Sequence, residues 1–152
     1  MRQRCPSRRP SLTVRLIGLV PALLLAIAVA LPGQAARADD AAAIRGVIAD
    51  QIAAFQRDDL DAAFAHASPG IQGKFRSPDT FGQMVRYGYP MIWRPSRWEM
   101  GETATTEAGP VQTVLFEDAA GALWEADYSM TEVDGVWRIS GVTLRKIPGV
   151  AS

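Results

Sequence analysis

The residues best suited to hold a small molecule are concentrated in one stretch, residues 87–95. Tyr89 and Trp93 each offer an apolar ring with a polar tip. Arg94 has the planar guanidinium that binds a carboxylate through two parallel hydrogen bonds. Aromatic walls with a few polar groups are typical of a small-molecule site. A simpler explanation is that the aromatics fill one end of the core and the prolines fix the loop, and both interpretations stay open.

Three further residues complete the set of candidate ligand-binding positions. His66 is the only histidine of the chain, and its imidazole titrates near neutral pH, which suits proton transfer. We favour a structural role for it, because it lies near the end of a predicted helix, where the dipole stabilises positive charge. Trp98 and Tyr128 lie on predicted strands and add aromatic surface. The candidate ligand-binding set is therefore Tyr89, Trp93, Arg94, Trp98, Tyr128 and His66, with no catalytic residue assigned.

Two carboxylates, Glu125 and Asp127, are two residues apart and therefore share one face of a predicted strand. Paired carboxylates can perform acid–base chemistry where burial drives their pKa values apart. Alternation places them opposite Trp124, Ala126 and Tyr128, which are better suited to a core. We therefore expect the carboxylates on a solvated face or at a polar dimer contact.

The composition argues against several classes of site. The single cysteine, Cys5, precedes an apolar N-terminal run, so the chain after residue 38 has no thiol for a disulfide, a nucleophile or a metal. One histidine without cysteine is a poor basis for a zinc site. Residues 39–152 carry ten Lys/Arg and sixteen Asp/Glu, a formal charge of −6, whereas nucleic-acid-binding domains present a basic face. We expect no metal, no cofactor and no nucleic-acid partner.

Residues 1–38 have the features of a secretory signal peptide. They contain six arginines and no acidic residue, with an apolar run at 16–31 followed by the small-residue site Ala36-Arg37-Ala38. The run is shorter than the roughly 20 residues of a spanning helix, and Gly18 and Pro21 interrupt it. We expect cleavage near Ala38 and a periplasmic or secreted domain at 39–152. Membrane attachment is expected only through an uncleaved signal segment.

Helical periodicity dominates the first half of this domain. Apolar residues recur at steps of three and four over 41–57, which predicts an amphipathic helix with one buried face. Asp39 or Asp40 is expected to cap its first turn. Gly88 is expected to end the last helix, and Pro90 to prevent its resumption. The other helical segments are expected at 60–67, at 71–75 as a single turn, and at 78–87.

The period changes to two after the aromatic stretch, which predicts strands. The connections between these strands are short, and Asp134-Gly135 is a strong hairpin signal, so neighbouring strands are expected to be antiparallel. The predicted fold class is α+β, with three N-terminal helices packed on a curved four-stranded antiparallel sheet in a cone-like arrangement. The expected strands are 96–106, 111–118, 123–131 and 136–144.

The order of these segments resembles a known superfamily. Segments 53–59, 62–64 and 134–142 are similar to the nuclear transport factor 2-like (SnoaL-like) superfamily. More narrowly, 67–72 and 89–95 resemble a bacterial exported family of this type that is described only as a domain of unknown function. The resemblance spans about residues 41–146. It implies a cone with a pocket between sheet and helices, often with a homodimer through the open sheet face, and it implies no particular activity.

Three hypotheses about function remain at this point. The leading one is an exported small-ligand-binding or protein-interaction domain of unknown specificity. The alternative is a SnoaL-like pocket enzyme, an isomerase or a hydrolase. The third is a structural dimer whose pocket is only a defect of the core. A buried Asp, Glu or His that faces a void would favour the enzyme.

Overall fold

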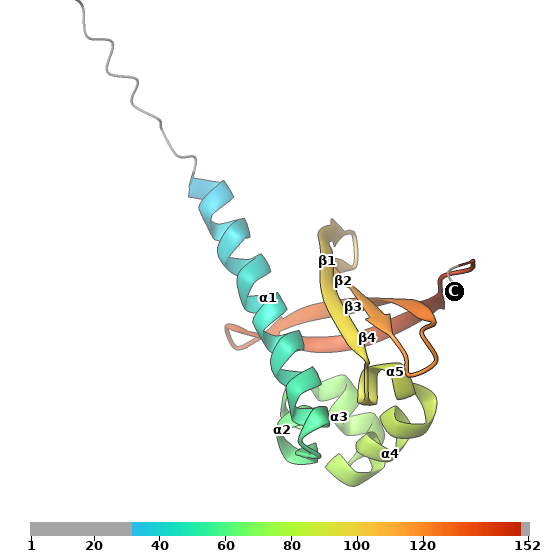
Figure 1. Cartoon of the computed structure of the whole chain (residues 1–152). Coiled ribbons are helices and arrows are strands. Elements are labelled where there is room, and N and C mark those ends of the chain that lie inside the picture. Colours follow the sequence, from blue (N-terminus) through green and yellow to red (C-terminus); the bar gives the residue numbers. More distant parts are fainter. Residues whose placement is uncertain (1–31, 150–152) are drawn as a thin grey trace, which may run out of the picture.

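The computed structural model describes residues 32–149, in which a group of helices is followed by a sheet (Figure 1). The predicted signal segment falls largely on residues 1–31, which lie outside the described residues. The described helices are α1 (Pro32–Gln56), α2 (Leu60–Ala65), α3 (Pro69–Phe75), α4 (Pro78–Gly88) and α5 (Pro90–Trp93). The strands are β1 (Arg97–Thr106), β2 (Gly109–Glu117), β3 (Leu123–Val133) and β4 (Val136–Lys146).

The four strands form one antiparallel sheet in the order β1-β2-β3-β4. Asp134 and Gly135 both have positive φ, at 52° and 76°, as the two-residue turn of a tight hairpin requires. The register shifts between Met100 and Thr103 and again between Ser129 and Met130. Such bulges bend a strand and increase its twist, so the sheet curves around the helices. The predicted α+β class is confirmed.

One face of the sheet packs on the helices, and this interface is the core. On β3, Ala126, Tyr128 and Met130 are buried while Ser129 between them is exposed, so the predicted alternation is confirmed. Burial of apolar surface at this interface is the main stabilising contribution, at about 25 cal/mol per Å². The large apolar side chains of α1 that are buried in the core are Ile44, Ile48, Ile52 and Phe55.

Helix α1 begins at Pro32, upstream of the predicted start at residue 41. The expected N-cap at Asp39 or Asp40 was therefore wrong, since both residues lie inside the helix and are exposed. The alanine-rich sequence of residues 35–43 explains the extension, because alanine has the highest helix propensity. The N-terminal turns of α1 project beyond the sheet (Figure 1). No helix in the described part of the chain is long and apolar enough to cross a membrane.

Two prolines begin helices: α3 extends the single turn expected at 71–75 by two residues toward the N-terminus, and α5 was not predicted. Pro69 is the first residue of α3, and Ser68 caps it by accepting a hydrogen bond from the backbone N–H of Ile71. Pro90 is the first residue of α5, so the expectation that it prevents a further helical turn was wrong. Proline is favourable at this position because its missing N–H has no partner there in any case.

A buried glutamine joins α1 to the bulge of β1. The side-chain amide of Gln112 donates to the carbonyls of Gly101 at 3.0 Å and Glu102 at 3.2 Å. Its oxygen accepts from Arg45 Nε at 3.2 Å, and Arg45 also donates to the Gly101 carbonyl. Because buried polar groups need partners, this network fixes the position of α1 across the irregular part of β1.

Candidate functional site

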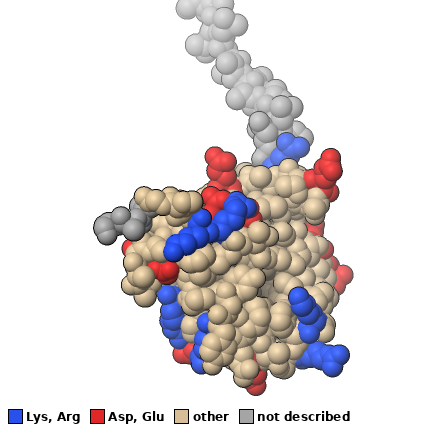
Figure 2. All heavy atoms as spheres, turned by 90° about the vertical axis from the view of Figure 1, so that its right-hand side faces the viewer, with Lys and Arg blue, Asp and Glu red and all other residues tan. Residues whose placement is uncertain are grey.

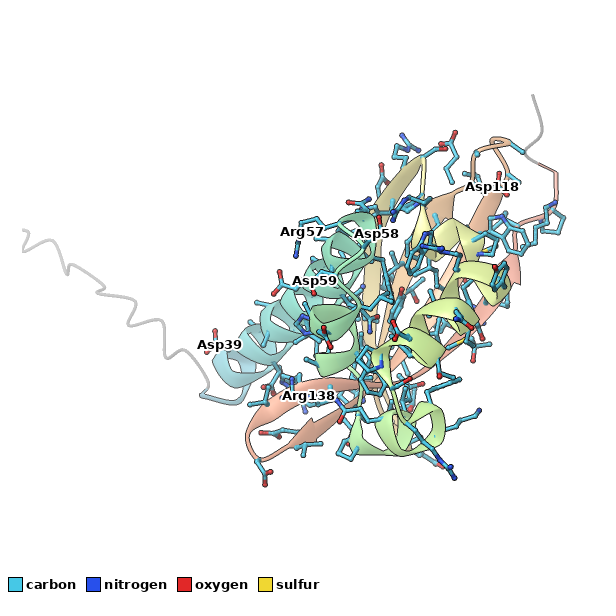
Figure 3. The ribbon with its side chains drawn as sticks, turned by 90° about the horizontal axis from the view of Figure 1, so that it is seen from below. Asp39, Arg57, Asp58, Asp59, Asp118 and Arg138 are labelled. Carbon is cyan, nitrogen blue, oxygen red and sulfur yellow. The ribbon has the colours of Figure 1, made fainter. Side chains whose placement is uncertain are left out.

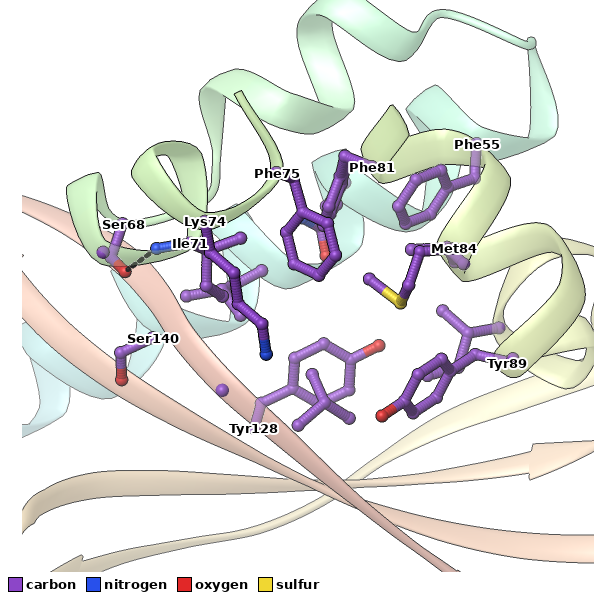
Figure 4. Close-up of a pocket in the computed structure, with 18 residues that line it drawn as sticks. Phe55, Ser68, Ile71, Lys74, Phe75, Phe81, Met84, Tyr89, Tyr128 and Ser140 are labelled. Atoms are coloured by element: carbon purple, nitrogen blue, oxygen red, sulfur yellow. Dashed lines mark hydrogen bonds between the residues drawn. The ribbon is translucent and has the colours of Figure 1, made fainter. Parts of the chain in front are cut away.

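A cavity of about 820 Å³ lies between the sheet and helices α3 and α4, and it opens to solvent (Figure 4). Its wall is mostly apolar. Cavities of this size and character are typical of small-molecule sites. The lining residues are Gln51, Phe55, Ser68, Gly70, Ile71, Lys74, Phe75, Phe81, Met84, Val85, Gly88, Tyr89, Ile92, Tyr128, Ile139, Ser140, Gly141 and Val142.

The α3 wall is attached to the sheet through the backbone. The N–H of Ser68 donates to the carbonyl of Ile139 at 2.8 Å, and the N–H of Ile139 donates to the carbonyl of His66 at 2.9 Å. Ala67 forms a parallel bridge with the same strand residue. This link places Ile71 on the cavity wall directly beside β4.

The α4 wall is held by close packing against α2 and by an aromatic cluster. A Cβ added at Gly82 would lie 2.5 Å from a methyl of Leu60, so glycine permits the close approach of the two helices. The ring of Phe81 lies 5.9 Å from Phe55, 5.4 Å from Phe64 and 5.7 Å from Phe75, centroid to centroid. These tilted and edge-on contacts are favourable geometries for aromatic pairs.

Tyr128 forms the floor of the cavity and is 0% exposed. Its hydroxyl has no hydrogen-bond partner among the described residues. Burial raises the pKa of Tyr128 well above its ordinary value of 10.0, so the phenol remains a neutral hydrogen-bond donor. Met84 and Tyr89 extend into the cavity near the hydroxyl end of Tyr128 (Figure 4). A buried hydroxyl without a partner is unusual and calls for an explanation.

Lys74, on α3, is the only charged residue among the described residues that line the cavity. Its side chain extends into the cavity from the α3 side, toward the floor formed by Tyr128 (Figure 4). The ammonium nitrogen lies 5.4 Å from the centroid of the Phe75 ring. The face of the protein shown in Figure 2 carries both signs of charge, mostly toward its edges, around a largely uncharged area.

Of the six candidate ligand-binding residues, Tyr89 and Tyr128 line the cavity. Trp93 is buried outside the lining, and its ring contacts Phe55 at 5.4 Å between centroids. Arg94 donates to both carboxylate oxygens of Asp58 at 2.9 Å, and to the carbonyls of Phe55 and Trp93. Asp58 is at the α1–α2 junction (Figure 3), so Arg94 ties α5 to the end of α1.

His66 and Trp98 also lie outside the cavity lining. Burial lowers the pKa of His66 below 6.5, and the charge of Arg138 adds to this effect while that of Asp50 opposes it. Trp98 is half-buried on the core-facing side of β1, where it pairs with Phe116. The binding role of all six residues stays a prediction, but the structure brings only two of them together in the cavity.

The carboxylates Glu125 and Asp127 lie on the outer face of the sheet, away from the helices. Arg145 of β4 forms ion pairs with both, and Thr113 donates a hydrogen bond to Asp127 at 2.9 Å. Leu115, 37% exposed, lies on the same face. A homodimer through this face stays a prediction.

Sequence reasoning missed Lys74, Phe75 and Met84, all of which line the cavity. Lys74 lies in a segment expected as a single helical turn, where a lysine usually faces solvent. The one feature of the sequence that could have drawn attention to Lys74 is that lysine is rare in this chain. Lys74 and Lys146 are its only lysines, beside fourteen arginines. In the described residues, no group of three or more His, Cys, Asp or Glu side chains is placed to hold a metal ion.

Comparison with known proteins assigns the fold and the family. No curated protein matches the chain. A solved structure from Silicibacter pomeroyi DSS-3, described as an NTF-2-like protein of unknown function, is similar with a TM-score of 0.52 and 17% identity. The similarity covers 73% of this chain and 98% of that chain, and at this identity it shows the nuclear transport factor 2-like fold alone. The family model described as a domain of unknown function, DUF4864, matches residues 37–152, and the chain belongs to that family.

Proposed function

We propose that the chain is an exported domain that binds a small, mainly apolar molecule in the cavity above Tyr128. The observation that carries this proposal is the hydroxyl of Tyr128, which is buried without a partner among the described residues in the floor of a mostly apolar cavity. Leaving a buried hydroxyl unsatisfied costs about 1–3 kcal/mol. A ligand with one hydrogen-bond acceptor on an apolar body offsets this cost, so ligand binding accounts for the unpaired hydroxyl.

The lining favours binding over the alternative of a SnoaL-like isomerase or hydrolase. None of the described lining residues is Asp, Glu or His, the groups that most often transfer protons in enzymes. The carboxylates Glu125 and Asp127 lie on the opposite face of the sheet. The polar groups that do line the cavity, such as Tyr128 and Tyr89, are suited to orienting a ligand.

Ligand binding is tested with a matched pair of variants on the same strand. Val142→Trp fills the cavity, whereas Val136→Trp adds the same ring at a surface position that is 45% exposed. A panel of small apolar compounds should raise the melting temperature of the wild-type protein and of Val136→Trp, but not of Val142→Trp. A ligand at 100 times its Kd stabilises by about 2.7 kcal/mol. Equal responses in both variants would refute binding in this cavity.

Export is the second part of the proposal. The DUF4864 match begins at residue 37, close to where the predicted signal peptide ends at residue 38. This coincidence supports processing near Ala38. Expression of the full chain in a Gram-negative host, followed by mass spectrometry of the periplasmic fraction, should give a product that begins at Asp39. A product that starts at Met1 and stays in the cytoplasm would exclude export.

A further inference from the structure

We propose that the ligand is an amphipathic monoanion, with a carboxylate that pairs with Lys74 and an apolar body that fills the cavity toward Tyr128. This inference rests on the proposed function, because it specifies the chemistry of the molecule that occupies the same cavity. Its basis is the position of a single ammonium group at an apolar wall.

Lys74 has no anionic partner in the described part of the protein. No carboxylate of these residues lies within 4.0 Å of its nitrogen, whereas Arg86, Arg94, Arg97 and Arg145 all form ion pairs. The contact that the structure does give is the face of the Phe75 ring, at 5.4 Å from the ammonium nitrogen to the centroid. A cation over an aromatic ring keeps its charge available for a second partner.

The form of the cavity determines what kind of anion fits. Lys74 is the one cationic group among the described lining residues, so it balances a single negative charge. A carboxylate carries one charge, whereas a phosphate monoester carries close to two near neutral pH. The remaining wall is built from groups such as Ile71, Met84 and Val142, which favour an apolar body. This combination indicates a carboxylate on an alkyl or ring system.

Two further residues on the wall suit the apolar part of such a ligand. The phenol of Tyr128 is closed off from solvent in the ligand-free protein, and once a neighbouring side chain such as Met84 moves aside it can donate a hydrogen bond to a hydroxyl or keto oxygen of the ligand. Met84 extends toward the hydroxyl end of Tyr128 in Figure 4, and its unbranched side chain adapts readily to ligands of different shape. The charge therefore lies on the α3 side of the cavity and the neutral donor at its floor.

The chain provides its own control for the lysine. Lys146 is the other lysine of the protein, and it also lies over an aromatic ring, with its nitrogen 5.5 Å from the centroid of Trp124. It does not line the cavity. Lys146→Met therefore removes the same charge and the same type of ring contact from a place outside the proposed site.

The first experiment uses isothermal titration calorimetry with three ten-carbon probes below their micellar concentrations: decanoate, decanol and decyltrimethylammonium. We expect decanoate to bind the wild type and Lys146→Met at least tenfold more tightly than decanol, and the cation to bind more weakly still. In Lys74→Met, decanoate should lose about tenfold in affinity, while decanol should be unchanged. Lys74→Arg should recover most of the lost decanoate affinity, a result that is not expected if Lys74 has a purely structural role.

The outcomes separate this inference from the proposed function. Equal binding of all three probes to the wild type would overturn the role of Lys74 and leave the apolar site standing. Loss of decanoate affinity in Lys146→Met but not in Lys74→Met would also overturn it. Failure of every probe to bind would remove the proposed function, and this inference with it. Melting curves of the variants show whether each of them is folded.

A second readout works on the wild-type protein alone. Amine-acylating reagents modify the N-terminus and the two lysines, and mass spectrometry measures each site separately. Decanoate should slow acylation of Lys74 by severalfold and leave Lys146 unaffected. Decanol should protect neither ammonium group. Equal rates at Lys74 with and without decanoate would refute the ion pair.

Discussion

Replacing Tyr128 by phenylalanine removes one oxygen atom from the floor of the cavity and keeps the ring that packs there. The hydroxyl is buried and has no partner among the described residues, so the folded protein has lost its hydration without gaining a hydrogen bond. In the unfolded chain the same hydroxyl is fully hydrated. The substitution should therefore stabilise the ligand-free protein, although most substitutions in a core destabilise it.

The magnitude follows from the cost of an unsatisfied hydroxyl, about 1–3 kcal/mol. Taking the lower end, we expect the free energy of unfolding of Tyr128→Phe to rise by about 1 kcal/mol. For a domain of this size, that gain raises the melting temperature by roughly 4 °C. Ligand affinity should move the other way, falling about fivefold for a ligand with an oxygen in reach of the hydroxyl, since a typical hydrogen bond contributes about 1 kcal/mol.

Urea denaturation of Tyr128→Phe and the wild type measures the stability change, and calorimetry with a hydroxylated or keto carboxylate measures affinity. The matched control is Tyr87→Phe, because Tyr87 is 81% exposed and its hydroxyl is hydrated in both states. That variant should differ from the wild type by less than about 0.5 kcal/mol. A loss of stability in Tyr128→Phe would show that the hydroxyl has a partner in the folded state, and would refute the reasoning.

Three further predictions concern residues outside the cavity. Arg94→Ala should lower the free energy of unfolding by about 1 kcal/mol in urea denaturation, because Arg94 holds Asp58 and the end of α1. Ligand affinity should be unchanged. A larger effect on affinity than on stability would show that Arg94 contributes to the ligand-binding site. Asp118, at the β2–β3 turn in Figure 3, has its pKa lowered below 3.8, first by the hydrogen bond from Trp124 and then by backbone N–H groups. The contribution of Asp118 to the free energy of unfolding is therefore present above its ordinary pKa and is lost as pH falls through its lowered pKa. The melting temperatures of Asp118→Ala and the wild type should converge in acid. A difference that stays constant with pH would contradict this. Burial lowers the pKa of His66, so its contribution to stability is complete above pH 6.5 and is lost as pH falls through the lowered value. The single histidine signal in an NMR titration should have its midpoint below 6.5, and His66→Gln should abolish this part of the pH dependence of stability.

The sheet and the core face of α1 could be predicted from the sequence because each follows a simple period. Alternation along β3 separated Tyr128 from Asp127, and the Asp134-Gly135 turn identified the last hairpin. The helix ends were less predictable, because the same residue supports different local structures. Asp39 is a good cap but is also tolerated within an alanine-rich helix, and Pro90 both ends one helix and begins the next.

The cavity was harder to predict because its composition depends on contacts between distant segments. Arg94 looked like a ligand-binding arginine in its local sequence, but its partner Asp58 lies 36 residues away. Tyr128 was included for its ring, yet the missing hydrogen-bond partner appears only once the helices are packed on the sheet. Lys74 is exposed, as its local sequence suggests, and its place at the edge of the cavity follows only from the link between Ser68 and Ile139, which holds α3 against β4.

That link has a consequence for how the site can change over evolutionary time. The bonds between Ser68, Ile139 and His66 are all made by backbone atoms, so almost any side chains at these positions preserve them. The distance between the α3 wall and the floor is therefore largely independent of which residues line the cavity. Substitutions at Lys74 or Met84 can alter the ligand that is recognised without moving the wall. In this protein, backbone hydrogen bonds set the position of the α3 wall, and the lining side chains set which ligand is preferred. Either property can therefore change in evolution while the other is retained.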